Sequence, residues 1–308
     1  MARNVKVSSI SFPGIPGNDP GRKEKAVQDA VDWIDQAACD KPDMILLPEV
    51  FALLGWNSES RLDEAEPVPG PTTERLAAKA KEYGSYIWCP LYEKTEEGYY
   101  NSAVLLGRCG EVVGVYRKTY PTIGELEMGV LPGAGAVTLS CDFGRVGTLI
   151  CFDLNFRELG AQYQQQGAEL ICFLSMFRGG LQLSIWAYEF GVFMASSTPV
   201  ENSRIVNPLG QVLADSSQYS RLITRTVNLD SAVLHLDYNE EKLKALKAKY
   251  GPLVELEVTG PEAVFLMTSH HPEVRVDDMI AEFEMERVED YLDRARAECR
   301  KRLTQAWC

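Results

Sequence analysis

Short apolar runs alternate along the chain with stretches in which apolar residues recur every three or four positions. Val5–Phe12 and Asp43–Leu47 have the length and composition of buried strands. Between them, one helical face is predicted from the apolar residues Val27, Ala30, Val31, Ile34 and Ala38. A second helix is predicted over Thr73–Tyr83, with Gly84 as its stop. Strands and helices that alternate in this way are typical of an α/β domain.

The middle and the second half of the chain extend this pattern. Three runs separated by turn-like residues predict an antiparallel meander, namely Tyr86–Tyr92, Tyr99–Leu106 and Val112–Arg117. Strand, helix and strand then follow in Gly144–Phe152, Glu158–Gln166 (closed by Gly167) and Ala168–Ser175. Further strands are predicted in Val200–Asp215 and Ala232–Asp237. The recurrence indicates two sheets covered by helices.

The domain organisation is predicted to be simple. No long linker divides the chain, so we expect one domain over residues 1–308. A helical extension is expected from about residue 277, because Asp277–Leu303 carries spaced apolar residues among many charges. Amphipathicity leaves open whether this helix packs on its own domain or bridges subunits.

Composition and charge restrict the kinds of partner and the compartment that we expect for this protein. Lys and Arg number 31 against 44 Asp and Glu, a net charge of −13, so a nucleic-acid partner is not expected. We also expect neither a signal peptide nor a membrane segment, since no apolar run approaches the roughly 20 residues that a span needs. The eight cysteines include no C-x-x-C pair, which favours free thiols in the cytoplasm over disulfides or a zinc site.

The chain contains three histidines and lacks the G-x-S-x-G, P-loop and H-E-x-x-H motifs. A histidine-based triad and a metallophosphoesterase are therefore disfavoured. The strongest local signal is Gly147–Asp153, an apolar strand that ends in Cys151. A cysteine there either fills the core or faces a cleft, where neighbouring N–H groups stabilise an oxyanion.

Two charged residues follow other predicted strands. Glu49 comes directly after Leu46-Leu47-Pro48, and Lys118 ends the run Val112–Arg117. Each alone is compatible with a surface role. Beside a thiol, however, the carboxylate of Glu49 can accept the thiol proton, and the ammonium of Lys118 can stabilise the thiolate and the oxyanion.

Together these segments resemble the nitrilase superfamily of carbon–nitrogen hydrolases, in its amidase or carbamoylase branch. The resemblance runs from the first strand to about Asp237. The matching segments are Leu47-Pro48-Glu49-Val50-Phe51, Tyr100-Asn101-Ser102, Tyr116-Arg117-Lys118, Pro132-Gly133, Gly144-Arg145-Val146-Gly147, Ile150-Cys151-Phe152-Asp153, Gly167-Ala168-Glu169 and Asn207-Pro208-Leu209-Gly210.

The resemblance implies a four-layer α-β-β-α sandwich with Glu49, Lys118 and Cys151 in its catalytic site. It implies attack of the cysteine on a small-molecule amide or carbamoyl carbon, a thioester intermediate and its hydrolysis, with no metal or organic cofactor. It also implies a homodimer or a higher homo-oligomer. The nitrile-hydrolysing branch and an inactive scaffold with the same fold are the alternatives.

Further site residues follow from the resemblance alone. Many relatives place a second glutamate between the lysine and the cysteine, and Glu125 is favoured over Glu127 for this role. The N–H of Phe152 is implied in the oxyanion hole. Asp153 matches an acidic position that is either functional or structural.

Two differences from the family pattern bear on the branch and on the helix after the cysteine. Arg157 stands where many relatives have proline, so the helix start is open. Phe152-Asp153 replaces the tryptophan and glutamate that are frequent in nitrile-hydrolysing relatives. Arg178 is a candidate for binding a substrate carboxylate. The candidate pocket residues, each of which also fits a packing role, are Trp56, Tyr120, Met176, Phe177, Arg178, Trp186 and Glu189.

Overall fold

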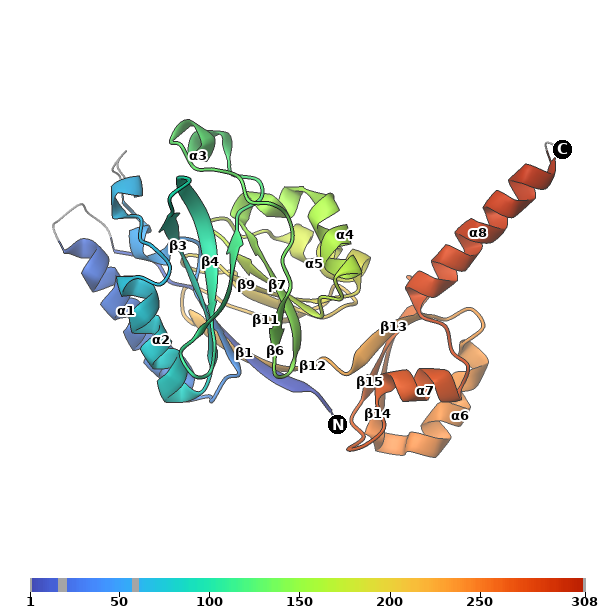
Figure 1. Cartoon of the computed structure of the whole chain (residues 1–308). Coiled ribbons are helices and arrows are strands. Elements are labelled where there is room, and N and C mark those ends of the chain that lie inside the picture. The colour runs from blue at the N-terminus through green and yellow to red at the C-terminus, as the bar shows by residue number, and fades with distance from the viewer. Residues whose placement is uncertain (1, 16–20, 57–60, 307–308) are drawn as a thin grey trace. The chain divides into compact units, whose positions relative to one another are not determined.

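The computed structural model describes residues 2–15, 21–56 and 61–306 (Figure 1). The chain divides into two compact units. The first is Val5–Val227, and the second combines the first few residues of the chain with the region from Asn228 onward. No helix in the described ranges is both long and apolar enough to cross a membrane.

The first unit contains two six-stranded sheets. One has the strand order β12-β1-β2-β3-β4-β5, with β1–β3 parallel and β3–β5 an antiparallel meander. Its strands are β1 (Asn4–Ile10), β2 (Met44–Leu46), β3 (Tyr86–Lys94), β4 (Tyr99–Leu106), β5 (Val112–Arg117) and β12 (Leu222–Asn228). The predicted meander is confirmed, because alternating apolar strands with short polar turns pair with their sequence neighbours.

The second sheet has the order β11-β10-β9-β8-β7-β6, with β7, β8 and β9 parallel. Its strands are β6 (Leu139–Cys141), β7 (Gly144–Ile150), β8 (Leu170–Leu174), β9 (Phe193–Ser197), β10 (Arg204–Val206) and β11 (Val212–Asp215). The strand predicted over Val200–Asp215 is two strands, because Asn207 closes a turn between them by accepting hydrogen bonds from the N–H groups of Leu209 and Gln211.

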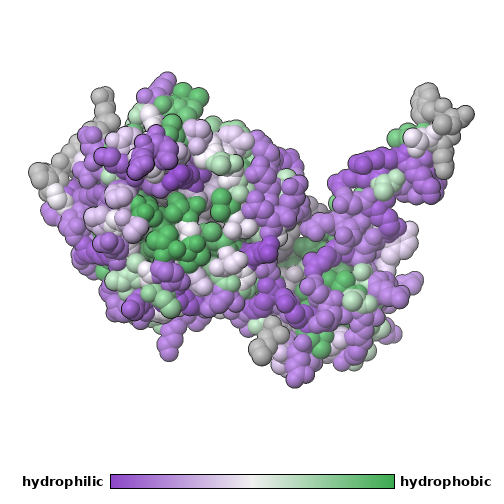
Figure 2. Space-filling model, viewed as in Figure 1, coloured by the Kyte–Doolittle hydropathy of each residue, from purple (hydrophilic) through white to green (hydrophobic). Residues whose placement is uncertain are grey.

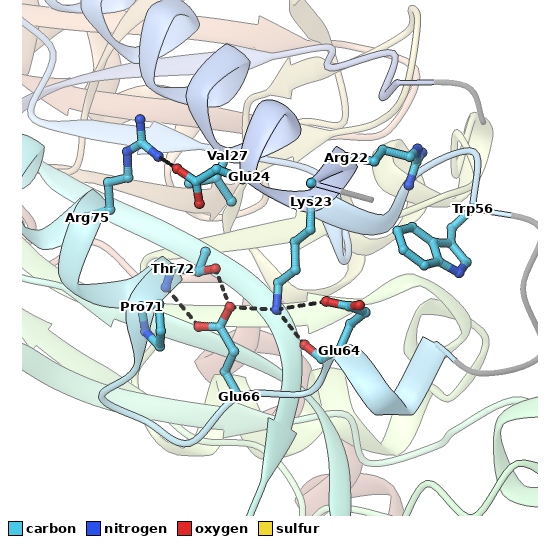
Figure 3. Close-up of a pocket in the computed structure, with 11 residues that line it drawn as sticks. Arg22, Lys23, Glu24, Val27, Trp56, Glu64, Glu66, Pro71, Thr72 and Arg75 are labelled. Atoms are coloured by element: carbon cyan, nitrogen blue, oxygen red, sulfur yellow. Dashed lines mark hydrogen bonds and ion pairs between the residues drawn. The ribbon is translucent and has the colours of Figure 1, made fainter. Parts of the chain in front are cut away.

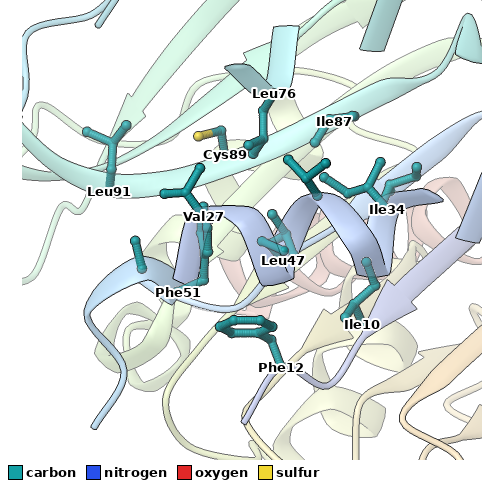
Figure 4. Packing of buried hydrophobic residues seen from close by; sticks show 14 of the residues in the cluster. Ile10, Phe12, Val27, Ile34, Leu47, Phe51, Leu76, Ile87, Cys89 and Leu91 are labelled. Atoms are coloured by element: carbon teal, nitrogen blue, oxygen red, sulfur yellow. The ribbon is translucent and has the colours of Figure 1, made fainter. Parts of the chain in front are cut away.

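Helices cover the outer face of each sheet, as Figure 1 shows. α1 (Arg22–Ala38) and α2 (Pro71–Tyr83) pack on the first sheet, where Val27 and Ile34 meet Ile87 and Cys89 (Figure 4). α4 (Arg157–Gln165) and α5 (Leu181–Phe190) pack on the second sheet.

The inner faces of the two sheets meet each other. Strand residues that alternate with those under the helices point inward, and the sulfur atoms of Met44 and Cys172 lie 3.6 Å apart across this interface. The predicted four-layer α-β-β-α sandwich is thereby confirmed.

The second unit has its own three-stranded sheet, in the order β13-β15-β14. Its elements are β13 (Ser231–His235), α6 (Glu240–Tyr250), β14 (Val254–Thr259), β15 (Val264–Ser269), α7 (Val276–Glu282) and α8 (Val288–Ala306). Phe265, Met267 and Met279 belong to its separate core. The structure thus differs from the expected single domain with only a helical extension from about residue 277, because β14 and β15 complete a sheet with β13.

The prediction of a single helix over Asp277–Leu303 is also wrong, because two helices form in this region. The chain leaves the helix after Glu282, Glu284 adopts a left-handed conformation (φ 49°), and Met285 turns into the core of this unit. α8 then begins at Val288 with a mostly hydrophilic surface, which Figure 2 shows, and Leu292 remains 42% exposed. Burial of Met285 decides the break, since a continuous helix would carry this residue past the core.

Candidate active site

The strand ends of both sheets bring the predicted residues together. β2, β3 and β5 run in one direction, so Glu49 after β2 and Lys118 after β5 lie at the same edge of the first sheet. Cys151 follows β7 in the second sheet. The side chains of Glu49 and Lys118 reach each other across the edge of the first sheet, with Lys118 Nζ 2.9 Å from Glu49 Oε1.

Cys151 stands in a strained turn. It directly follows β7 and opens the 3₁₀-helix Cys151–Asn155, and its φ of 50° lies in the left-handed region that a residue with a Cβ rarely adopts. The residue is partly buried. This conformation turns the thiol out of the strand direction, as a nucleophile that must face a substrate requires.

Asp153 holds this turn in place. Its buried carboxylate accepts hydrogen bonds from the N–H of Ile150 (3.0 Å), the N–H of Tyr120 (2.8 Å) and the hydroxyl of Tyr116 (2.8 Å). Burial raises the pKa of Asp153 to about 7, against the effect of these donors. Asp153 therefore ties the cysteine turn to the segment that follows Lys118, and its contacts are structural.

Glu49 is buried and fully bonded. Its Oε1 accepts hydrogen bonds from Lys118 Nζ (2.9 Å) and Asn101 Nδ2 (2.8 Å), while Oε2 accepts one from the N–H of Met176 (3.0 Å). Glu49 also lies close enough to Cys151 for its charge to raise the pKa of that thiol. Glu49 is thus fixed in orientation beside the group whose proton a cysteine nucleophile must lose.

Lys118 lies between two carboxylates. Only 1% of its side chain is exposed, and Nζ donates to Glu49 and, at 2.7 Å, to Glu125 Oε2. Burial alone would lower the pKa of Lys118, but the two carboxylates outweigh it and raise the pKa above its ordinary value. The ammonium is therefore permanently charged beside the thiol.

Glu125 comes from α3 (Ile123–Glu127), a short helix whose outer side exposes Ile123 and Leu126 (Figure 2). Its carboxylate accepts hydrogen bonds from Asn101 Nδ2 (2.7 Å) and from the N–H of Thr122 (2.8 Å). Burial alone would raise the pKa of Glu125, but Lys118 and these donors hold it below its ordinary value. Glu125 is therefore ionised at neutral pH and held against Lys118.

The thiol of Cys151 is protonated in the resting site. Burial, followed by the nearby Glu49 carboxylate, raises the pKa of Cys151 to about 12, while Lys118 acts in the opposite direction. A thiol in this state needs a base at the moment of attack. The site supplies one in Glu49, with Lys118 close enough to offset the charge that develops.

The two candidate glutamates on α3 differ sharply in placement, since Glu125 is buried against Lys118 and Glu127 is exposed. We expect Glu125→Gln to lower kcat by roughly 10²-fold, because Lys118 loses an ionic partner, and Glu127→Gln to leave it within about twofold. Steady-state rates of both variants check this. Equal rates for the two variants would contradict it.

The other predicted pocket residues serve varied roles. Tyr120 stacks on Phe156 with ring centres 3.7 Å apart, and its hydroxyl donates to Glu158 (2.9 Å). Phe152, the implied oxyanion donor, meets Phe156 edge-on and directly follows Cys151. Arg178 is paired with Glu201 at 3.1 Å. Its side chain is 57% exposed, so the guanidinium stands at the surface.

Several other candidates have packing or surface roles, while Trp56 also lines the separate cavity described below. Trp186 is buried and donates its indole N–H to the Leu154 carbonyl (2.9 Å). Glu189 forms an ion pair with Arg157, the residue at the start of α4 where many relatives have proline. The remaining candidates are Trp56, which packs against a cluster with Val50, Leu53 and Tyr92, Phe177, which meets Phe173 edge-on, and Met176, which is 41% exposed.

Sequence reasoning missed three residues around the ionic cluster. Asn101, at the start of β4, donates to both Glu49 and Glu125. Tyr92 of β3 is buried, and its hydroxyl lies in the field of these two carboxylates, which after burial itself raise the pKa of Tyr92. Ser175 follows β8 at the strand end next to Cys151, where it acts to lower the pKa of the Cys151 thiol. For Asn101 a signal was present, because Tyr100-Asn101-Ser102 is one of the segments that match the family.

A separate cavity of about 450 Å³ lies beside α1 and α2 (Figure 3). Lys23 reaches into it and pairs with Glu66 at 2.6 Å, and Glu66 also accepts from the N–H (2.8 Å) and hydroxyl (2.6 Å) of Thr72. These groups satisfy one another and hold the start of α2. Across the described ranges, no group of three or more His, Cys, Asp or Glu residues is arranged to hold a metal ion.

A sequence model of carbon-nitrogen hydrolases matches residues 14–234, a range that includes Glu49, Lys118 and Cys151. The chain belongs to the carbon-nitrogen hydrolase family. The expected membership of the nitrilase superfamily is confirmed, and the enzyme cleaves non-peptide carbon–nitrogen bonds by the cysteine chemistry general to this family.

Named relatives of this carbon-nitrogen hydrolase include several amidases. It is 25% identical to the human omega-amidase NIT2 over 78% of this chain and 94% of the relative, and 26% identical to the deaminated glutathione amidase of Bos taurus over 68% and 73%. Among solved structures, Saccharomyces cerevisiae Nit3 shares the fold with a TM-score of 0.65 at 20% identity, covering 82% of this chain and 96% of that one.

Proposed function

We propose that the protein hydrolyses an amide or N-carbamoyl group of a small molecule through a thioester on Cys151, without a metal or an organic cofactor. The observation that carries the proposal is the buried cluster in which Lys118 lies 2.9 Å from Glu49 and 2.7 Å from Glu125, next to the Cys151 thiol whose pKa both Glu49 and Lys118 affect. A buried lysine between two carboxylates beside a cysteine has no evident packing role.

In the first half of the reaction, Glu49 takes the thiol proton as the sulfur of Cys151 attacks the carbonyl carbon. Lys118 and the N–H of Phe152 stabilise the oxyanion. The carbon–nitrogen bond then breaks, Glu49 returns the proton to the leaving nitrogen, and ammonia or an amine departs. The acyl group stays on sulfur as a thioester.

In the second half, Glu49 takes a proton from water, which attacks the thioester. The carbon–sulfur bond breaks and the thiolate leaves, taking back the proton from Glu49. The carboxylic acid, or the carbamic acid when the substrate is an N-carbamoyl compound, is released. Throughout, Glu125 and Asn101 keep Lys118 and Glu49 in place.

The substrate is proposed to be an amide or an N-carbamoyl compound rather than a nitrile. The names of the relatives support this choice, since they include omega-amidase and deaminated glutathione amidase. The Phe152-Asp153 pair after the nucleophile supports it as well. Arg178 is proposed to bind a substrate carboxylate only where an anionic substrate displaces its partner Glu201.

The experiment is to measure ammonia or amine release by the wild type across linear amides, N-carbamoyl compounds and nitriles, with a chelator present throughout. Release from one of the first two classes supports the proposal and names the bond. Release from nitriles alone would make the protein a nitrilase instead. Loss of activity with chelator would contradict a metal-independent mechanism.

We also propose assembly into a homodimer or higher homo-oligomer in a reducing compartment such as the cytoplasm. In support, α5 exposes Leu181 (73%), Ile185 (45%) and Tyr188 (41%), one apolar stripe along a helix. The cysteines in the described ranges are free, as a thiol enzyme needs. Light scattering checks the assembly: we expect at least twice the 34.3 kDa chain mass, and Ile185→Asp should lower it.

A further inference from the structure

Ser175 occupies the strand end beside the nucleophile. β7 and β8 are parallel, and Ile150 pairs with Leu174, so the next residues along the two strands are Cys151 and Ser175. Ser175 is fully buried, and its N–H is held by the carbonyl of Ser197 at 3.0 Å. The backbone therefore fixes the position of its hydroxyl next to the turn that carries the thiol.

The hydrogen bonds of this hydroxyl define its direction. Ser175 Oγ accepts a hydrogen bond from the N–H of Phe177 at 2.9 Å, which leaves the hydroxyl hydrogen for another partner. The sulfur of Cys151, at the end of the neighbouring strand, is the partner that this position offers. The N–H of Met176, the residue between Ser175 and Phe177, donates to Glu49, so this short turn binds the base and lies beside the nucleophile.

We infer that Ser175 is a further residue of the catalytic site, whose hydroxyl donates a hydrogen bond to the Cys151 sulfur and stabilises the thiolate during attack and during thioester breakdown. The inference rests on the proposed role of Cys151. In both half-reactions the sulfur carries negative charge for a moment, and hydrogen bonds to a charged acceptor are the strong ones. The N–H of Phe177 fixes the position of the hydroxyl oxygen and leaves its O–H free to point at the sulfur.

The test compares Ser175→Ala with the matched control Ser197→Ala. Ser197 is equally buried, ends the neighbouring strand β9, and donates its hydroxyl to the Ile10 carbonyl at 2.8 Å. Alkylation of Cys151 by iodoacetamide is followed by mass spectrometry of its peptide between pH 7 and 10, which separates it from the exposed Cys39, Cys109 and Cys299. Circular dichroism checks that each variant is folded.

We expect Ser175→Ala to slow alkylation of Cys151 about tenfold, with the rate profile displaced by about one pH unit to higher pH. The kcat should fall by a similar factor while KM changes little. Ser197→Ala should leave the alkylation profile unchanged. A purely structural Ser175 would lower the melting temperature without displacing this profile.

The experiment distinguishes failure of the inference about Ser175 from failure of the proposed function. A folded Ser175→Ala protein with the wild-type alkylation profile would overturn the role of Ser175, whatever the enzyme's substrate. A displaced profile in a protein that releases no ammonia or amine from any substrate would support the hydrogen bond and contradict the proposed function instead.

Discussion

Cys151→Ala is expected to reduce hydrolysis by roughly 10⁴-fold or more while leaving the fold intact. The thioester cannot form without the sulfur, and Glu49 and Lys118 have no other nucleophile to activate. The residue is only partly buried, and its backbone turn is held by Asp153 rather than by the thiol. Ammonia release and thermal unfolding of the variant measure the two effects separately.

Cys172→Ala is the matched control. This cysteine lies fully buried between the sheets, with its sulfur 3.6 Å from that of Met44. Removing it should lower the free energy of unfolding by about 1 kcal/mol and leave kcat within about twofold. Near wild-type turnover in Cys151→Ala would exclude it as the nucleophile, and an equal loss of turnover in Cys172→Ala would mean that the loss in Cys151→Ala does not by itself identify the nucleophile.

The grouping of Glu49, Lys118 and Cys151 was predicted from the family resemblance of the segments that contain them. Each follows an apolar strand, a position that taken alone fits either an open sheet edge or a surface role. The fold class followed from the same pattern, because both sheets and their covering helices have clear periodicities. These predictions depend on motifs and periodicities that are formed by residues close together in the sequence.

The rest depends on contacts between distant residues. Glu125 was favoured over Glu127 from the resemblance alone, and its contact with Lys118, at 2.7 Å, is not marked by any hydrophobic period in so short a helix. In the sequence, Ser175 is only the last residue of a predicted buried strand. Its position next to Cys151 follows from the pairing of β7 with β8, which the sequence does not show. The second unit was missed because β14 and β15 alternate only weakly and pair with β13 across a helix.

Lys118→Met should have the second large effect, on both activity and stability. The variant leaves the carboxylates of Glu49 and Glu125 buried without their cation, and we expect a loss of about 3–5 kcal/mol in the free energy of unfolding near pH 8. Turnover should fall by about 10³-fold, because thiolate and oxyanion lose their positive charge. Urea unfolding and ammonia release give the two quantities.

The pH dependence makes this prediction specific. In the wild type the folded pKa of Glu125 lies below its ordinary value, so its stabilising effect is present above about pH 4.5 and lost as the pH falls. Without Lys118, burial dominates and raises that pKa, so the variant is stabilised at low pH and loses this stability as the pH rises. The difference between the two proteins should therefore widen from pH 5 to pH 8.

Lys79→Met provides the control for removing a lysine with two acidic partners. Lys79 pairs with Asp35 at 2.8 Å and Glu82 at 2.9 Å on the surface of the first unit, where water screens the charges. We expect a change of at most about 1 kcal/mol with no widening between pH 5 and pH 8. A Lys118→Met protein that behaves in the same way would mean that its ammonium does not hold the buried carboxylates in their charged form, and the electrostatic account of this site would fail.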